Sequence, residues 1–362
     1  MKQARAPGKI ILSGEHAVVY GAPAIVCAVQ RYTTIGFAPM HRSRTIRTAL
    51  SGISGGKHYR TSALQQLKAK LDRRFDQYNR GERAVQNILR RPDDLVIYSL
   101  ATLLQHIPLP GFSSNRRLPV PGRLSSNSEL PLGAGMGSSA AAIAATLVLY
   151  ENLTGYTMSA QQRFERVRFC ERLQHGRGSA IDAAATVYGG IQSLHDGTPT
   201  PLETTLNGNW YWILSGIPIV STGECVAHVR QHHSKDHTLW QQFADTTLAL
   251  QNALENDSDP RAALQENHRL LTHIGVVPAP AAALIAAVEA AGGAAKISGA
   301  GAHRGEGGGI ILAYHPDPQA LPLFLNQSPV YRWENLHIAE QGAHILPDTD
   351  STEALTASAI TT

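Results

Sequence analysis

Gly133-Ala-Gly135-Met-Gly137-Ser138-Ser139, which runs directly into an alanine-rich stretch, is the segment that decides the fold. Alternate glycines allow positive φ angles and bring backbone N–H groups close to an anion. A helix that follows such a turn adds its free N-terminal donors and the positive end of its dipole. The two serines stand where the helix begins, so their hydroxyls could cap it, contact a phosphate or bind magnesium. The segment therefore predicts a phosphate-binding turn, although its spacing matches neither a P-loop nor Gly-x-Gly-x-x-Gly.

The composition is typical of a soluble globular protein. The chain has 362 residues, 43% of them hydrophobic and 17% charged, and this length predicts two domains. The formal net charge of +4 comes from dispersed basic residues, many of them between Arg42 and Arg91, so no nucleic acid is needed to explain it. Cys27, Cys170 and Cys225 are too scattered for a disulfide framework or a zinc site. With no signal-peptide pattern or membrane-length apolar run, we expect a cytoplasmic protein that binds neither nucleic acid nor membrane.

Hydrophobic periodicity predicts a β-rich start, a helical middle and an α+β second half. The expected strands are Ile10 to Leu12, Ala24 to Val29, Thr33 to Phe37, Trp210 to Leu214, Ile310 to Tyr314 and Leu336 to Ile338. The expected helices are Ser62 to Leu71, Arg80 to Leu89, Asp93 to His106, the glycine turn to about Leu153, Ser159 to Gln174, Leu239 to Glu255, Arg261 to His273 and Pro280 to Ala291. We expect domains at 1–190 and 191–347, followed by a disordered tail at 348–362.

Two further segments accompany the glycine turn. Residues 6–21 read Ala-Pro-Gly-Lys-Ile-Ile-Leu-Ser-Gly-Glu-His-Ala-Val-Val-Tyr-Gly, and residues 296–301 read Lys-Ile-Ser-Gly-Ala-Gly. In this order the three segments resemble motifs 1, 2 and 3 of the GHMP small-molecule kinases, which phosphorylate galactose, homoserine, mevalonate and phosphomevalonate. The resemblance implies an α/β plus α+β fold with a ribosomal-protein-like N-terminal domain and a ferredoxin-like C-terminal domain. It also implies ATP as co-substrate, bound by Gly133, Gly135, Gly137, Ser138, Ser139, Gly299 and Gly301.

Two carboxylates flank a glycine-containing loop later in the chain. Glu171 and Asp182 stand on either side of His-Gly-Arg-Gly-Ser-Ala-Ile, which resembles the mevalonate kinase segment Glu-x-x-x-His-Gly-x-Pro-Ser-Gly-x-Asp. That resemblance implies Mg²⁺ ligation by Ser139 and Glu171, with Asp182 as catalytic base or orienting carboxylate. It also implies that Lys9 reaches toward Asp182 and the reacting oxygen, where a cation would neutralise charge on the transferred phosphoryl group. Taken alone, Glu171 would be a solvated helix residue and Asp182 a helix N-cap.

The substrate prediction depends on motif 1. Gly-Glu-His-Ala-Val-Val-Tyr-Gly is close to the mevalonate kinase form of that motif, which implies phosphorylation of the primary hydroxyl of mevalonate early in isoprenoid synthesis. Glu15, His16 and Thr222 are then the expected substrate-side residues. A phosphomevalonate kinase, another small-alcohol GHMP kinase and, from a different class, a non-catalytic GHMP-fold ligand-binding regulator remain open. A homodimer also remains open.

Motif 3 departs from the family pattern. Ala302-His303-Arg304-Gly305-Glu306 interrupts what is a compact glycine run in the family. We call these five residues the insertion. The altered shape bears on substrate choice more than on the use of ATP.

Overall fold

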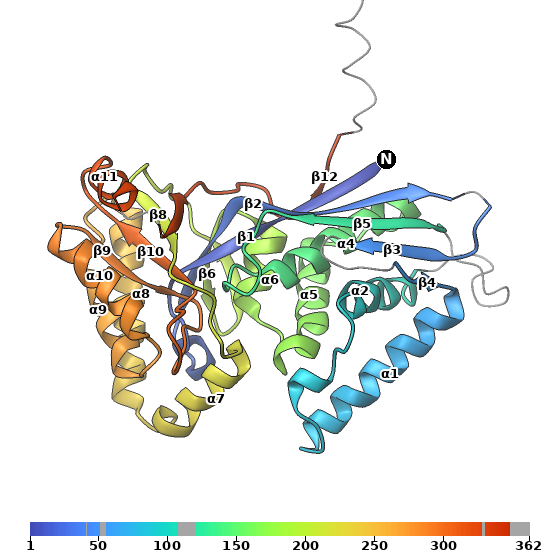
Figure 1. Cartoon of the computed structure of the whole chain (residues 1–362), viewed down its shortest axis with the longest axis horizontal. Coiled ribbons are helices and arrows are strands. Elements are labelled where there is room, and N and C mark those ends of the chain that lie inside the picture. The colour runs from blue at the N-terminus through green and yellow to red at the C-terminus, as the bar shows by residue number, and fades with distance from the viewer. Residues whose placement is uncertain (41, 51–55, 108–119, 328–329, 348–362) are drawn as a thin grey trace, which may run out of the picture.

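The computed structural model describes residues 1–40, 42–50, 56–107, 120–327 and 330–347. Two lobes lie side by side along the long axis of the molecule (Figure 1). In that view a large sheet with helices beneath it forms the right-hand lobe, and a smaller sheet with its helices forms the left-hand lobe. The buried apolar residues form two clusters, the larger of which includes most of the interior of the right-hand lobe.

The first sheet contains eight strands among the described residues. They are β1 (Lys2–Ser13), β2 (Ala24–Pro39), β3 (Ile46–Leu50), β4 (His58–Tyr59), β5 (Gly122–Ser128), β6 (Ile191–His195), β7 (Thr198–Pro201) and β12 (His344–Ile345). Their order is β12-β1-β2-β5-β3-β4, and β6 pairs with β2 and β7. The β3–β5 pair is parallel, and the other pairs are antiparallel.

Helices α4 and α6 pack directly on β1 and β2. The helices of this lobe are α1 (Thr61–Asn79), α2 (Asp94–Leu104), α4 (Ser138–Thr154), α5 (Ala160–His175) and α6 (Ala180–Tyr188). The small side chains of the alanine-rich α4 let it lie between the sheet and α2, and most of its residues are buried. Because α6 lies beside α4 on the same strands, the starts of these two helices come close together.

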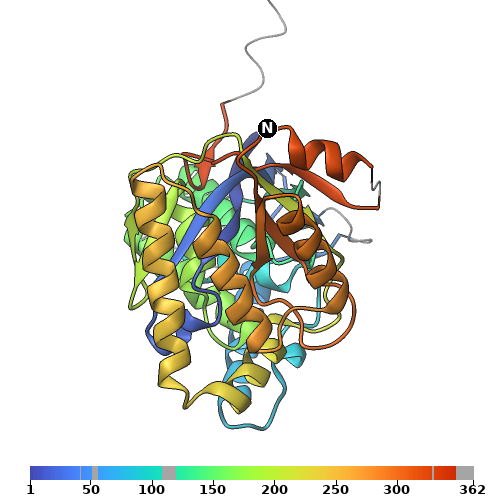
Figure 2. The ribbon, with the colours of Figure 1, turned by 90° about the vertical axis from the view of Figure 1, so that its left-hand side faces the viewer.

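The second sheet has the antiparallel order β11-β8-β10-β9. Its strands are β8 (Trp210–Leu214), β9 (Ala294–Ser298), β10 (Ile310–Tyr314) and β11 (Arg332–Asn335). The helices of this lobe are α7 (Thr222–His233), α8 (His237–Glu255), α9 (Arg261–His273), α10 (Ala279–Ala290) and α11 (Ala320–Asn326). Figure 2 looks at this end of the molecule, where α9 and α10 pack on the sheet and α8 packs against α9.

Most of the predicted elements are confirmed. The strands at 210–214 and 310–314 and the helix at 261–273 have the expected bounds. Ser159 caps α5 in a capping box with Gln162. The two strands expected at 24–29 and 33–37 form the single long strand β2. The part of the prediction that depended on strong periodicity and on capping residues was therefore reliable.

Two predicted elements are wrong. The helix at 80–89 is absent because α1 ends at Asn79 and Gly81 follows with φ +75°, so only a 3₁₀ turn forms at Val85–Asn87. The strand at 336–338 is also absent. The segment before it, β11, pairs with β8, and Leu336 donates to the carbonyl of Trp210. The chain then leaves the second sheet and returns to β2 at the single bridge between Val29 and Ile338.

The lobes share segments of chain, which bears on the domain boundary expected near residue 190. Strands β6 and β7 follow that point but belong to the first sheet, as does β12 near the end of the described chain. The boundary itself remains a prediction, and the expected tail at 348–362 lies outside the described residues. None of the helices in the described ranges has the length and apolar character needed to span a bilayer.

Candidate active site

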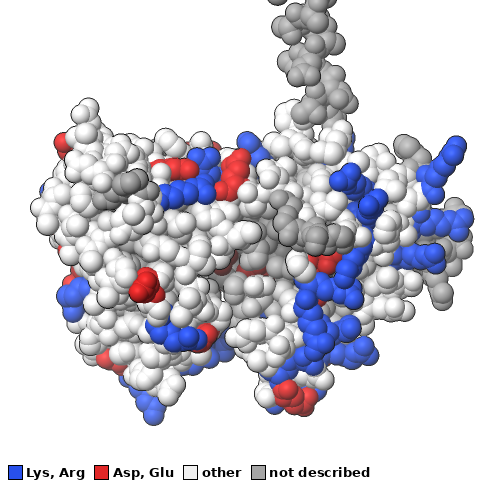
Figure 3. All heavy atoms as spheres, in the orientation of Figure 1, with Lys and Arg blue, Asp and Glu red and all other residues white. Residues whose placement is uncertain are grey.

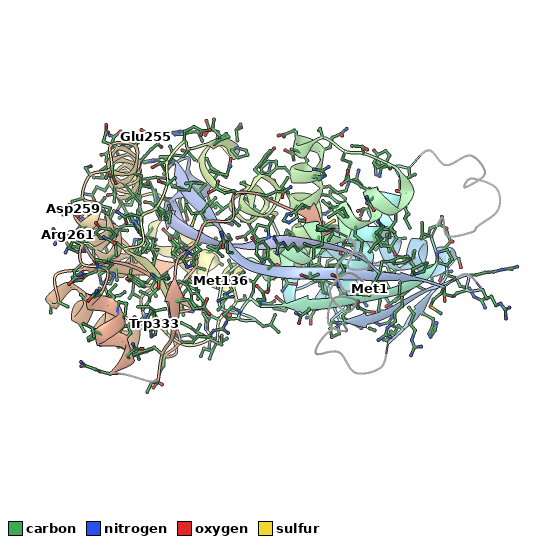
Figure 4. All side chains as sticks on the ribbon, turned by 90° about the horizontal axis from the view of Figure 1, so that it is seen from above. Met1, Met136, Glu255, Asp259, Arg261 and Trp333 are labelled. Atoms are coloured by element: carbon green, nitrogen blue, oxygen red, sulfur yellow. The ribbon has the colours of Figure 1, made fainter. Side chains whose placement is uncertain are left out.

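The glycine turn has the conformation that its sequence predicts. Gly133, Gly135 and Gly137 have φ angles of +76°, +88° and +73°, a region that other residues enter only with strain. Gly137 is the N-cap of α4 and supplies no side-chain cap, so the first N–H groups of the helix remain available for an anion. Ser138 and Ser139 are the first two residues of α4, not its cap. Met136, at the middle of the turn, lies toward the centre of the molecule in the view from above (Figure 4).

Lys9 and Asp182 form an ion pair in front of this turn. The Lys9 Nζ lies 3.2 Å from Asp182 Oδ1, and the two side chains are 6% and 17% exposed. The Lys9 N–H donates to the carbonyl of Met136 at 3.0 Å, which attaches β1 to the turn. A Cβ atom at Gly137 would lie 3.0 Å from Lys9 Cγ and 3.6 Å from Asp182 Oδ1. Glycine at 137 therefore lets the helix start and the ion pair meet.

Taken alone, the position of Asp182 in the sequence suggested a helix N-cap. The structure shows that Asp182 is not the N-cap of α6. Ser179 caps α6, and its Oγ accepts from the Asp182 N–H at 3.1 Å. The Asp182 carboxylate lies in the first turn of the helix, where the dipole favours a negative charge. This carboxylate is consequently free to interact with Lys9 and with a bound molecule.

Glu171 is a fully buried carboxylate behind this pair, at the C-terminal end of α5. Burial, followed by the nearby charge of Asp182, raises the pKa of Glu171 to about 8, while the Ser139 hydroxyl and Lys9 act in the opposite direction. Neither carboxylate oxygen has a well-formed hydrogen bond among the described residues. His175 Nε2 lies 3.4 Å from Glu171 Oε2. Glu171 is therefore not a solvated helix residue, and among the described residues it has no ion pair with a Lys or Arg side chain that would offset its burial.

This donor set fits a magnesium ion held jointly with phosphates. A buried carboxylate without a well-formed hydrogen bond and a neighbouring serine hydroxyl are hard oxygen ligands of the kind that Mg²⁺ prefers. No group of three or more His, Cys, Asp and Glu side chains in the described part of the chain could hold a metal by itself. Any such ion would therefore depend on phosphate oxygens for the rest of its ligands, as Mg²⁺ commonly does in phosphoryl-transfer sites.

Motif 3 lies against both of the other motifs. A Cβ atom at Gly299 would lie 3.9 Å from the carbonyl of Gly135 and 4.0 Å from Lys9 Nζ. A Cβ at Gly301 would instead lie 2.1 Å from the carbonyl of Val276, so this glycine allows a close backbone approach away from the turn. Gly299 therefore lies beside the glycine turn, and its role at the phosphates stays a prediction. ATP binding by Gly301 stays a prediction. In the structure the absence of a side chain at Gly301 allows its backbone to pack closely against Val276.

The motif 1 pair Glu15-His16 makes its contacts with the second lobe. Glu15 is ion-paired with Lys296 of β9, and both side chains are buried. His16 has a φ of +58°, and its Nε2 donates to the carbonyl of Ala300 at 3.0 Å. Burial lowers the pKa of His16 to about 4, so its ring is neutral. Direct contact of these two residues with a substrate stays a prediction, and in this structure they join motif 1 to motif 3.

Thr222 lies at the other side of the site. It is the exposed first residue of α7, whose cap is Ser221. A Cβ atom at the neighbouring Gly223 would lie 3.7 Å from the carbonyl of His175. The start of α7 therefore abuts the loop between Glu171 and Asp182. Contact of Thr222 with a substrate stays a prediction.

Sequence reasoning missed two residues of this site, His175 and Lys296. His175 is the first residue of the segment 175–181 that separates Glu171 from Asp182. Its position four residues after Glu171 on a helix was a signal that the two side chains would meet. Lys296 opened the motif 3 segment as a lysine within an apolar strand pattern. A lysine in such a position needs a buried partner, but nothing local indicated that the partner would be Glu15.

The surface charge differs between the two lobes. Lys and Arg side chains gather over the right-hand lobe in Figure 3, the lobe of the first sheet. Many of the basic residues lie between Arg42 and Arg91 in the sequence. Most of the Lys and Arg residues in that segment are exposed. The basic residues of this segment are therefore largely solvated.

Comparison with known proteins gives consistent matches. Residues 95–190 match the model of the GHMP kinases N terminal domain. A mevalonate kinase of Archaeoglobus fulgidus is 30% identical over 314 residues, which cover 85% of this chain and 90% of that protein. The structure of Methanococcus jannaschii mevalonate kinase aligns with a TM-score of 0.73 and 18% identity, covering 93% of this chain and 98% of that one. L. major mevalonate kinase in complex with R-mevalonate aligns with a TM-score of 0.64 and 19% identity, covering 93% and 97%.

Proposed function

The chain belongs to the mevalonate kinase family of the GHMP kinases, and from this premise we propose that it transfers the γ-phosphoryl group of ATP to the primary hydroxyl of mevalonate, giving 5-phosphomevalonate. One observation carries the proposal. The Lys9–Asp182 pair lies in front of an anion-binding helix start and remains partly accessible. A small alcohol held there would be placed between a carboxylate and the phosphates.

The reaction follows from these positions. The substrate hydroxyl oxygen attacks the γ-phosphorus, the bond from that phosphorus to the bridging oxygen of ADP breaks, and the hydroxyl proton passes to the Asp182 carboxylate. The Lys9 ammonium, 3.2 Å from Asp182, neutralises charge that spreads over the phosphoryl oxygens. The glycine turn, the start of α4 and Gly299 hold the phosphates through backbone N–H groups.

Mg²⁺ would be held by Glu171, Ser139 and phosphate oxygens, and it would supply charge neutralisation between the phosphates. The buried Glu171 carboxylate supports this role because its ionised form lacks a compensating partner. Substrate contacts would come from His16 and from the Thr222 end of α7, which adjoins the Glu171–Asp182 loop. Glu15 would act behind them through Lys296.

The test is ADP release by the purified protein with magnesium and ATP, measured against mevalonate, phosphomevalonate, galactose and homoserine in parallel. We expect release with mevalonate. Release with phosphomevalonate instead would replace the substrate and keep the kinase mechanism. ATP binding without turnover on any member would favour the non-catalytic binding protein. The Asp182→Asn variant, purified in the same way, controls for contaminating ATPase activity.

A further inference from the structure

The insertion at 302–306 lies on α7, with Ala302 buried and Arg304, Gly305 and Glu306 exposed. Arg304 Nη2 donates to Glu224 Oε1 at 2.8 Å, and His303 Nε2 lies 4.0 Å from the same oxygen. The His303 ring stacks on His228, one turn further along the helix, with centroids 4.3 Å apart and an interplanar angle of 7°. The insertion thus supplies the arginine of the ion pair and one imidazole ring, and α7 supplies the glutamate and the second ring.

The segment that precedes α7 also contacts the end of motif 3, mostly through the backbone. Ser215 donates from its N–H to the carbonyl of Gly309, and Gly309 donates to the carbonyl of Gly216, both at 2.9 Å. A Cβ atom at Gly305 would lie 2.7 Å from Cγ1 of Ile219. The segment that leads into α7 is therefore held against the end of motif 3 along its length, and the insertion extends this contact onto the helix itself.

The held end of α7 is the end that adjoins the candidate active site. A Cβ atom at Gly223 would lie 3.7 Å from the carbonyl of His175, the last residue of α5, which stands between Glu171 and Asp182 in the sequence. Cys225 Sγ donates to the carbonyl of Ala300 at 3.0 Å, and His16 Nε2 donates to the same carbonyl. Motif 1, motif 3 and α7 consequently meet at one peptide group. A shift of α7 would move the exposed Thr222 relative to this junction.

We propose that Arg304 and His303 of the insertion form a clasp with Glu224 and His228, and that this clasp positions the start of α7 as the substrate-side wall of the active site. Arg304 and His303 are positioning residues, because they act through α7 and not on the reacting atoms. The clasp tunes the affinity for the alcohol substrate and leaves the phosphate site unchanged. The kinetic part of this inference rests on the proposed function.

The variant Arg304→Gln removes the ion pair and keeps a side chain of similar length. Because the pair is partly exposed, we expect the KM for mevalonate to rise about two- to fivefold, with kcat and the KM for ATP at wild-type values. Adding His303→Ala removes the stacked ring as well, and the KM for mevalonate should rise further. The charge reversal Glu224→Arg with Arg304→Glu should restore the wild-type KM. Arg269→Gln is the matched control, because Arg269 is an exposed arginine paired with Glu266 on α9.

Hydrogen exchange of the backbone amides in α7 provides a readout that does not depend on turnover. In the variant with both Arg304→Gln and His303→Ala, residues 222–233 should exchange faster than in wild type, while the start of α4 should be unaffected. Unchanged exchange in α7 would overturn the clasp even if the KM changed. If the enzyme phosphorylates mevalonate, and α7 exchanges faster while the KM for mevalonate is unaltered, the clasp has no role in substrate affinity. An enzyme inactive on mevalonate would contradict the proposed function, while the exchange result would still decide whether the clasp exists.

Discussion

Two lysine–carboxylate pairs lie close to one another in this protein and serve different purposes. Lys9–Asp182 retains some exposure on both side chains and lies in front of a turn that can bind an anion. Lys296–Glu15 is fully enclosed, and Lys296 also donates to the carbonyl of Ile297. Burial lowers the pKa of Lys296, and only its partner Glu15 opposes this effect substantially. The comparison teaches that exposure, not residue type, distinguishes the pair for which we propose a catalytic role from the structural pair.

The largest expected effect comes from breaking the accessible pair. Asp182→Asn removes the proton acceptor and should lower kcat by about 10²- to 10⁴-fold, because that is the typical contribution of a positioned general base. ATP affinity should be nearly unchanged, since the glycine turn and the start of α4 remain. Steady-state ADP release and ATP titration measure the two quantities. Asp245→Asn, an exposed aspartate on α8, is the control, and an Asp182→Asn enzyme with normal turnover would remove the assigned role.

Breaking the enclosed Lys296–Glu15 pair should lower the free energy of unfolding. Lys296→Met leaves the Glu15 carboxylate buried without its partner and should lower the free energy of unfolding by about 3–5 kcal/mol. Adding Glu15→Gln removes the stranded charge and should recover much of that loss in urea denaturation. The half-exposed Lys68–Asp72 pair on α1 gives the control, because Lys68→Met should change the unfolding free energy by less than about 1 kcal/mol. A double variant no more stable than Lys296→Met would contradict this account.

A smaller effect should appear in the pH dependence of stability, through His16 beside the enclosed pair. Its pKa is about 4 in the folded protein, below the ordinary value of 6.5, so the unfolded chain binds the proton more readily. Its contribution is therefore fully present above about pH 6.5 and decreases as the pH falls toward 4, by about 2 kcal/mol between pH 7 and pH 5. Urea denaturation at both pH values should show this loss in wild type. The difference should be smaller in His16→Gln, whose amide can still donate to Ala300, and equal pH dependence in the two proteins would show that His16 is not the group responsible.

The sequence predicted those parts of the site that depend on neighbouring residues. The positive φ angles of the glycine turn, the start of α4 and the cap at Ser159 each follow from residue types within a few positions. It ended the first helix at Leu71, eight residues before α1 ends at Asn79, and it placed a second helix at 80–89, where the periodicity outweighed Gly81 as a stop signal. The resemblance to known motifs, not the local pattern, brought Lys9 and Asp182 into one hypothesis. Their ion pair joins residues 173 positions apart, beyond any local signal.

By itself, the sequence determined the glycine turn with its positive φ angles, the order of most helices and strands, and the family to which the motifs belong. Only the tertiary structure decided that Glu15 is paired with Lys296 and that the insertion lies on α7. The physical reason is the range of the forces involved. Backbone conformation and helix capping are set by adjacent residues, whereas the partner of a buried charge is set by which strands and helices pack together across hundreds of residues of chain.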